Sequence, residues 1–156
     1  MKALLVILII ILIPVLLISA EAEEREVYVI CNPASYVCIR QKPKKADNIS
    51  GSLECGDSFK TDGRVKNGYI HLLGLTEDGE GWVHTGYVVE DQPVICKTFA
   101  TVAATGRVKA CRFIDGQRKE WVPVGTDLTV YAISEEWAVT SKGFIRTRYL
   151  EVWDGE

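Results

Sequence analysis

The feature of this sequence that most constrains its fold is an internal repeat. Val29-Ile30-Cys31 is echoed by Val94-Ile95-Cys96, and residues 81–88, which read GWVHTGYV, are echoed by residues 143–150, which read GFIRTRYL. Between these pairs, residues 36–40 and 55–59 match residues 108–112 and 124–128 in the same order. A repeated sequence folds as copies of one unit. The polar segment 90–93, which ends in proline, marks the boundary between two copies.

Within each copy the pattern is that of β-strands. Runs such as residues 127–131 and 137–140 are short, alternate roughly between apolar and polar positions, and are rich in β-branched and aromatic residues. Turn dipeptides fall between the runs, namely Asp62-Gly63, Asn67-Gly68, Asp78-Gly79 and Asp115-Gly116. No stretch after residue 22 carries a sustained helical period. The sequence therefore predicts an all-β protein with two small barrels in tandem.

An apolar segment precedes the repeats. Lys2 is followed by an almost unbroken run of Leu, Ile and Val over residues 3–20, and Ala20-Glu21-Ala22 forms a small-x-small cleavage site. This pattern is typical of a secretory signal peptide, and the alternative is an uncleaved membrane anchor. We expect residues 1–22 to be one of the two, and the rest of the chain to be exported. The formal net charge of −3 argues against a nucleic-acid partner.

The closing motif carries a resemblance to a known family. Gly81-Trp82-Val83 followed by Tyr87, and Gly143-Phe144-Ile145 followed by Tyr149-Leu150, resemble the bacterial Src-homology-3-like (SH3-like, or SH3b) domain of exported and cell-wall proteins. The resemblance covers residues 28–90 and 94–152. It implies one SH3-like β-barrel over residues 23–91, a second over residues 92–152, and a tail at 153–156. It also implies that aromatic side chains and adjoining loops can line a groove for cell-wall peptide.

The five cysteines are expected to pair if the protein is exported. Spacing alone leaves 15 arrangements of two bridges and one free thiol open. The repeat favours one bridge per copy, Cys31–Cys38 and Cys96–Cys111, and leaves Cys55 as the free thiol because Val124 occupies its counterpart. A Cys38–Cys55 bridge across neighbouring strands is the alternative.

Catalysis finds little support in the sequence. The two histidines, His71 and His84, fall in predicted strands, where a solvent-facing structural role is the plainer interpretation. A cysteine-peptidase reading would need Cys55 activated by one of them. Residue spacings typical of metal sites or of serine hydrolases are absent, so neither a metal nor another cofactor is expected.

Binding is the remaining class of function. We expect Trp82, Tyr87, Phe144 and Tyr149 to fill the interior and Trp121 and Trp137 to be exposed ligand contacts. Tyr69, which stands where the family usually has Trp, is a third candidate. A basic surface is also predicted for the second copy, suited to teichoic acid or lipid headgroups. Its residues are Arg107, Lys109, Arg112, Arg146 and Arg148.

These observations predict a non-catalytic, exported binding module of the bacterial cell envelope that recognises peptidoglycan or another wall polymer. The alternative is a membrane-tethered or secreted protein–protein adaptor. In either case the expected partner is a wall polymer or an envelope protein. Contact with the membrane is expected only through residues 3–20.

Overall fold

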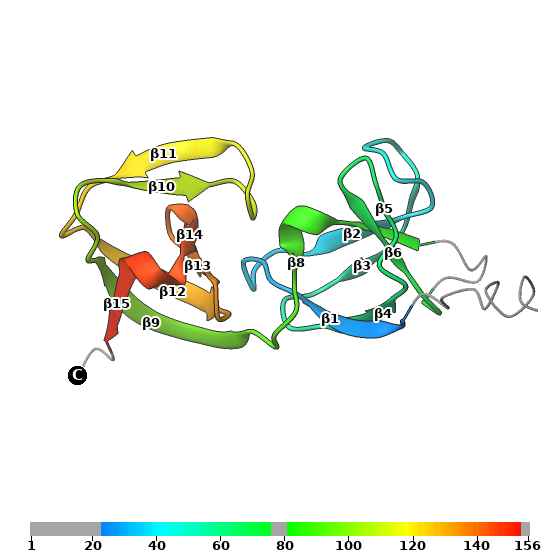
Figure 1. Cartoon of the computed structure of the whole chain (residues 1–156), viewed down its shortest axis with the longest axis horizontal. Helices are drawn as coiled ribbons and strands as arrows, with labels where there is room; N and C mark the ends of the chain where they lie inside the picture. Colours follow the sequence, from blue (N-terminus) through cyan, green and yellow to red (C-terminus); the bar gives the residue numbers. More distant parts are fainter. Residues whose placement is uncertain (1–22, 76–80, 154–156) are drawn as a thin grey trace, which may run out of the picture.

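The computed structural model describes residues 23–75 and 81–153, and within these ranges the chain forms β-strands and two short 3₁₀ helices but no α-helix. This confirms the all-β prediction (Figure 1). The elements are β1 (Arg25–Val29), β2 (Val37–Arg40), β3 (Ile49–Leu53), β4 (Ser58–Thr61), β5 (Val65–Lys66), β6 (Tyr69–Leu72), β7 (Gly81–His84), η1 (Thr85–Tyr87), β8 (Val88–Val89), β9 (Val94–Val102), β10 (Val108–Cys111), β11 (Arg118–Val122), β12 (Asp127–Ile133), β13 (Trp137–Thr140), β14 (Gly143–Arg146), η2 (Thr147–Tyr149) and β15 (Leu150–Trp153).

The strands form three antiparallel sheets. Strands β1–β8, which we call the N-terminal half, build a sheet of order β4-β1-β8 and a sheet of order β3-β2-β7-β6-β5. Strands β9–β15, the C-terminal half, build a single sheet of order β11-β10-β14-β13-β12-β9-β15. Figure 1 shows the two halves side by side, with β9 leading from one into the other.

The order of strands repeats between the halves. The arrangement β4-β1-β8 corresponds to β12-β9-β15, and β3-β2-β7-β6 corresponds to β11-β10-β14-β13. The halves differ where these two arrangements meet. In the C-terminal half β12 pairs with β13, whereas in the described N-terminal half the equivalent strands are joined by one isolated bridge, Lys60 to Leu73. The N-terminal strands are thus two sheets where the C-terminal strands are one.

The hydrogen bonds fix which residues are equivalent, and they correct the predicted alignment. Val29 accepts from the Gly56 N–H at 2.8 Å, and Val102 accepts from the Gly125 N–H at the same distance. The residue after each valine donates to a tyrosine carbonyl, Ile30 to Tyr87 and Ala103 to Tyr149, both at 2.9 Å. Val29 therefore corresponds to Val102 and not to Val94. The three-residue echo that begins at Val94 lies at the start of β9, whereas the true equivalent of Val29 is the last residue of that strand.

One of the turns predicted from an Asn-Gly or Asp-Gly pair is a two-residue hairpin turn in the structure. β5 and β6 are joined by Asn67 and Gly68 with φ of 53° and 78°, the left-handed pair that a tight two-residue hairpin requires. The predicted turn at Asp78-Gly79 lies outside the described residues, as do the predicted export segment 1–22 and the tail residues 154–156. Among the residues that were described, no helix has the length and hydrophobicity to cross a membrane.

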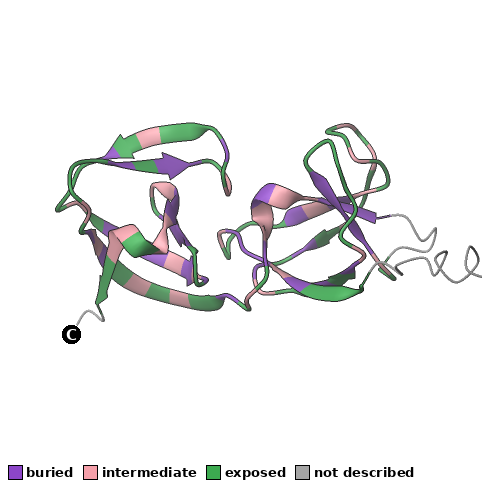
Figure 2. Cartoon of the chain, in the orientation of Figure 1, coloured by how far each residue is buried: buried purple, intermediate pink, exposed green. Residues whose placement is uncertain are grey.

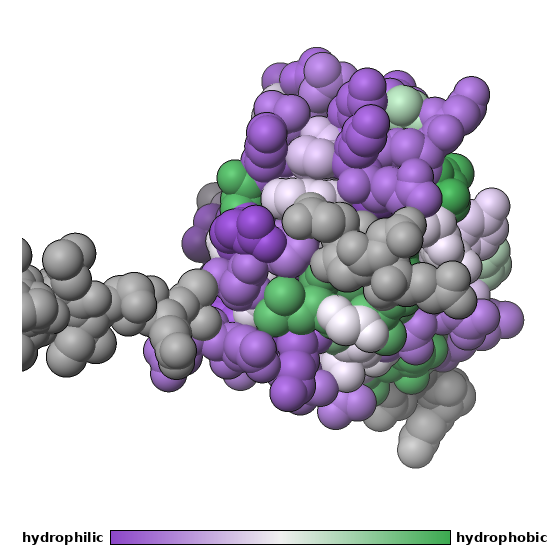
Figure 3. Space-filling model, turned by 90° about the vertical axis from the view of Figure 1, so that its right-hand side faces the viewer, coloured by the Kyte–Doolittle hydropathy of each residue, from purple (hydrophilic) through white to green (hydrophobic). Residues whose placement is uncertain are grey.

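The largest hydrophobic core continues from one half into the other. It contains buried residues of the N-terminal half together with Cys111, Ala132, Trp137, Val139 and Phe144 of the C-terminal half. Figure 2 shows buried residues alternating with exposed ones along strands of both halves, and buried residues also on segments where the halves meet. The far end of the N-terminal half, seen in Figure 3, is mostly hydrophilic with small hydrophobic areas. The two halves are therefore packed against each other through a shared core.

The loop that carries Phe113 makes close contacts between the two halves. Phe113, in the loop between β10 and β11, packs so closely on Gly86 of η1 that a Cβ there would lie 2.5 Å from the ring. The next residue, Ile114, donates its N–H to the Gly86 carbonyl at 2.9 Å. On another side, the Asp91 carboxylate accepts the Glu135 N–H at 2.7 Å. These contacts hold the C-terminal half against η1.

Candidate functional site

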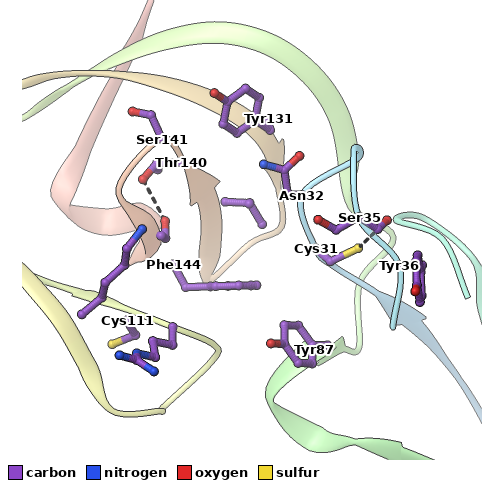
Figure 4. A pocket seen from close by; sticks show the side chains of 14 residues that line it. Cys31, Asn32, Ser35, Tyr36, Tyr87, Cys111, Tyr131, Thr140, Ser141 and Phe144 are labelled. Atoms are coloured by element: carbon purple, nitrogen blue, oxygen red, sulfur yellow. Dashed lines mark hydrogen bonds between the residues drawn. The ribbon is translucent and has the colours of Figure 1, made fainter. Parts of the chain in front are cut away.

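The main cavity of the described chain lies between the two halves, and we call it the groove. It has a volume of about 630 Å³. From the N-terminal half it is lined by Tyr87 and by the segment that leaves β1, including Asn32, Ser35 and Tyr36. From the C-terminal half it is lined by residues of β10–β14. Figure 4 shows Phe144, Thr140 and Tyr131 on one side of this space, and Cys31, Ser35, Tyr36 and Tyr87 on the other.

A smaller cavity of about 310 Å³ adjoins the groove. Tyr36 and Tyr87 line both, so the two spaces share a wall. The other lining residues of the smaller cavity are Val37, Cys38, Arg40, Lys45, Tyr69, His84 and Phe113. We call the groove and this cavity together the groove system.

A chain of aromatic rings runs along the groove system and joins the halves. Tyr69 on β6 meets His84 on β7 edge to face, with centroids 5.2 Å apart, and His84 meets Phe113 at 4.8 Å. Tyr87 then contacts Phe144 at 5.9 Å. Such edge-to-face pairs are favourable because the positive edge of one ring meets the negative face of the other. We call this chain of rings the aromatic ladder; it places flat apolar faces along a surface that also carries polar groups.

The charge of the groove system has one sign. Its lining contains four cationic side chains and no carboxylate. The cations are Arg40, Lys45, Arg112 and Lys119. Arg112 and Lys119 form no ion pair with any residue in the described part of the chain. Unpaired cations without compensating acids create a positive potential that favours an anionic ligand.

Two ionisable rings in the groove system are held neutral. Burial lowers the pKa of His84 below its ordinary value, and the nearby Arg40 charge lowers it further. Its Nδ1 accepts the Gly86 N–H at 3.1 Å, which requires an unprotonated nitrogen. Burial also raises the pKa of Tyr87, so its hydroxyl keeps its proton at neutral pH. The positive potential therefore comes from the arginines and lysines and not from the histidine.

The three predicted ligand contacts have different environments. Trp121 on β11 is exposed, as expected, with the guanidinium carbons of Arg107 and Arg118 at 4.6 Å and 4.9 Å from its ring centroid. Trp137 is only 5% exposed, so the expectation of an exposed ring is wrong. Tyr69 is also buried, at 8%, although one edge lines the smaller cavity.

Trp137 is buried because it belongs to β13, all four residues of which are covered. It contributes to the core that the halves share, and Arg146 covers its face at 4.2 Å. Trp82 and Phe144 are buried as predicted, whereas Tyr87 and Tyr149 are only partly buried. Tyr87 is only partly buried because its side chain lines the groove.

The predicted basic surface is divided among separate places. Arg112 lies in the groove, and Arg107 lies on Trp121. Lys109, Arg146 and Arg148 line a small cavity of about 230 Å³ together with Trp137 and Tyr149. Arg146 is paired with Asp115 and Glu136, which offsets part of the charge there. Within the described part of the chain, Lys109 and Arg148 form no ion pair, so this second cavity also carries positive charge, but unlike the groove system its lining includes a carboxylate, that of Asp115.

The cysteines are not arranged as predicted. No disulfide joins any of the five cysteines, all of which lie in the described residues, so the structure contains neither Cys31–Cys38 nor Cys96–Cys111. The corrected register explains why the repeat argument fails. Since Arg40 pairs with Trp82 where Cys111 pairs with Phe144, Cys111 corresponds to Arg40 and not to Cys38. Cys55, predicted to be the odd thiol, instead contacts Cys31.

Cys55 and His71, two of the residues that a cysteine peptidase would need, contact other partners and not each other in the structure. Cys55 is hydrogen-bonded to Cys31. His71 is buried, contrary to the predicted solvent-facing position, and its Nδ1 lies 3.0 Å from the Asp62 carboxylate and 2.7 Å from the Arg64 guanidinium. Among the described residues, no group of three or more His, Cys, Asp and Glu side chains could hold a metal ion.

Local sequence patterns do not indicate most of the groove residues. Tyr36 lies in the segment after β1 and is 68% exposed, which the sequence around it does not indicate. Phe113 lies in the loop between β10 and β11 and belongs to no repeated motif. The groove forms where the halves meet, and its residues come from positions that the repeat does not relate.

Comparison with known proteins adds little to this geometry. No protein-family model and no curated protein matches the chain. Solved structures similar to it include NlpC2 from Trichomonas vaginalis, with 12% identity, a TM-score of 0.36, and coverage of 83% of this chain and 48% of that one. NlpC1 from the same organism has 13% identity and a TM-score of 0.37, with coverage of 85% and 47%. The chain thus spans about half the length of each.

Proposed function

We propose that this protein is a non-catalytic binding module of the bacterial cell envelope that takes an anionic segment of peptidoglycan or of another wall polymer into the groove system. The observation that carries the proposal is the lining: four cations, no carboxylate and a ladder of aromatic rings. Export through residues 1–22 belongs to the same proposal and rests on the sequence pattern alone.

Each half is proposed to be one SH3-like unit. Three observations support this: the repeated strand order, the 3₁₀ helix before the last strand of each half, and the paired hydrogen bonds that make Val29 equivalent to Val102. Neither half offers the cavity on its own, because the groove is lined from both sides. The tandem arrangement is therefore a requirement for binding in this proposal.

The expected recognition follows from the side chains. Arg112 and Lys119 would pair with a carboxylate or phosphate of the polymer, and charge-assisted bonds to guanidinium groups are the stronger kind. Tyr36, Tyr87 and Phe144 would cover the apolar faces of sugars or of short side chains. The hydroxyl groups of Ser35 in the N-terminal half and Ser141 in the C-terminal half would add neutral hydrogen bonding from the two sides of the groove. We assign no bond-making or bond-breaking step to these groups.

A second candidate is a protein–protein adaptor, and one surface favours it. On the C-terminal half, Phe99 of β9 stacks on Trp153 of β15 with centroids 5.4 Å apart, and both are exposed above 40%. Because Phe99 and Trp153 are directly paired in the register of β9 and β15, the two rings lie on the same face of the sheet. Groups of exposed apolar side chains mark interaction surfaces.

The deciding experiment is co-sedimentation of the full chain, kept in mild detergent, with purified insoluble peptidoglycan. The test variant is Arg112→Ala with Lys119→Ala, and the matched control is Arg107→Ala, an exposed arginine that lies on Trp121 away from the groove. We expect the double variant to lose at least tenfold in bound fraction at low salt, and the control to bind like the wild type.

Repeating the measurement at about 0.5 M salt, where the screening length falls to roughly 4 Å, separates contact from long-range attraction. Equal loss in the test and control variants would refute the groove and leave a diffuse basic surface. Absence of binding by the wild type would refute wall recognition and favour the adaptor.

A further inference from the structure

Cys31 and Cys55 lie in contact although they are far apart in sequence. Cys31 follows β1, and Cys55 lies in the turn between β3 and β4. The Cys31 N–H donates to the Cys55 sulfur at 3.4 Å, and the two side chains are hydrogen-bonded to each other. Both residues are buried, at 3% and 8% exposure. The two thiols therefore meet inside the N-terminal half, out of bulk solvent.

The backbone holds the two segments together independently of the sulfurs. The Val29 carbonyl accepts from Gly56, the residue after Cys55, and the Val29 N–H donates to the Asp57 carbonyl, both at 2.8 Å. Closing a bond between the sulfurs would thus link segments that are already neighbours. A disulfide needs closely spaced backbones, and these hydrogen bonds hold the two segments next to each other.

The C-terminal half shows that the fold does not need this pair. Since Val29 corresponds to Val102 and Gly56 to Gly125, the positions of Cys31 and Cys55 are taken there by Ala104 and Val124. The same turn thus forms without sulfur. The thiol pair is an added feature of the N-terminal half.

We propose that Cys31 and Cys55 form the structural disulfide of this protein, with Cys38, Cys96 and Cys111 remaining thiols. The bond would anchor the segment that leaves β1, and that segment supplies Asn32, Ser35 and Tyr36 to the groove. The proposal concerns this chain whether or not the groove binds a polymer.

The pair is suited to oxidation by a small disulfide. The hydrogen bond from Cys31 lowers the pKa of Cys55 to about 7, so a substantial share of Cys55 is thiolate at neutral pH, while the pKa of Cys31 is raised. The Cys55 thiolate attacks one sulfur of oxidised glutathione, forms a mixed disulfide and releases one glutathione thiolate, which takes up a proton. Cys31 then gives its proton to solvent and attacks the Cys55 sulfur, and the second glutathione leaves. Two thiols are oxidised, and one glutathione disulfide is reduced to two thiols.

The test is a thiol map of the full chain after equilibration with oxidised glutathione. The chain is denatured in N-ethylmaleimide and digested with trypsin without reduction. Cys31 and Cys38 share the tryptic peptide 26–40, Cys55 lies in 46–60, Cys96 in 67–97 and Cys111 in 110–112. We expect peptide 26–40 to be linked to 46–60, with three of the five cysteines alkylated and two glutathione thiols released per chain.

Variants identify which cysteine of peptide 26–40 is bonded. Cys38→Ser replaces a half-buried side chain and should keep the link, whereas Cys31→Ser and Cys55→Ser should abolish it. If Cys31→Ser does not fold, Cys38→Ser alone decides, because loss of its link would make Cys38 the partner of Cys55. Five alkylated cysteines, a Cys31–Cys38 loop within peptide 26–40, or a link between 67–97 and 110–112 would each overturn the proposal.

Discussion

The docking of the two halves can be tested by adding a single methyl group. In the variant Gly86→Ala, the new Cβ would lie 2.5 Å from Cδ2 of Phe113 and 3.0 Å from Nδ1 of His84. Ordinary carbon contacts begin near 3.4 Å, so the ring must move by about 0.9 Å. On its other side the ring lies against Gly116, where a Cβ would likewise come within 2.4 Å of Cδ2, so the ring is held between two glycines. Overpacking of this kind costs about 1–3 kcal/mol.

The measurement is urea unfolding of the full chain, followed by tryptophan fluorescence. With a denaturant slope of about 2 kcal/mol per molar, a loss of about 2 kcal/mol lowers the midpoint by about 1 M. The matched control is Gly51→Ala in β3, where the nearest atom to a new Cβ is the flexible end of Ile39 at 3.4 Å. We expect the control to change stability by less than about 0.5 kcal/mol.

A double variant tests the cause. Phe113→Ala removes a half-buried ring and should cost about 2 kcal/mol, roughly half the loss for a fully buried phenylalanine. Once the ring is gone, the closest clash of the Gly86→Ala methyl, at 2.5 Å, is removed, and the Cβ of residue 113 and Nδ1 of His84 remain, each at 3.0 Å. The double variant should therefore be more stable than the sum of the single effects by about 1 kcal/mol. Strict additivity, or equal losses for Gly86→Ala and Gly51→Ala, would refute the docking argument.

Three further predictions follow from other parts of the structure. Burial alone would raise the pKa of Asp62, but hydrogen bonds from Arg64 and His71 hold it below its ordinary value. The contribution of the Asp62 carboxylate to stability should therefore be complete above about pH 4 and be lost as pH falls below that. In the variant Asp62→Asn, the acid limb of a curve of Tm against pH should flatten. Dithiothreitol should destabilise the oxidised wild type by about 3 kcal/mol, since the Cys31–Cys55 bond closes a loop with a sequence separation of 24, and should leave Cys55→Ser unchanged; equal shifts in both would contradict this. Trp137→Ala should cost about 3–5 kcal/mol in urea unfolding because its ring is buried in the shared core, whereas Trp121→Ala should cost less than about 1 kcal/mol, and the reverse order would contradict the burial of these rings.

The strands and turns could be predicted because their signals are local. Alternation of apolar residues marks β12, and the Asn67-Gly68 pair marks the hairpin between β5 and β6. Trp82 was correctly placed in the core because it lies in a short motif within a strand. Each of these signals is contained in fewer than ten residues, and none depends on which strands become neighbours.

The cysteine partners and the groove could not be predicted because they depend on register. A two-residue shift in the alignment of β2 with β10 changes which cysteines are equivalent between the halves, since strand register decides which side chains meet. Trp137 was misplaced for a related reason: the acidic residues before it suggested exposure, but Arg146 from the neighbouring strand covers it. Contacts between strands are set by the whole sheet, and local composition does not reveal them.

In the proposed function, docking of the halves and binding of the polymer are linked through Tyr87. Its neighbour Gly86 receives Phe113, and its own ring contacts Phe144 across the groove. A change that separates the halves would therefore also remove one wall of the groove, even if every groove residue were intact. Conversely, a polymer that touches both walls binds only the docked arrangement and must stabilise it by linkage. The repeat thus supplies two similar units, and the residues that differ between them, Phe113 above all, create the site that neither unit has alone.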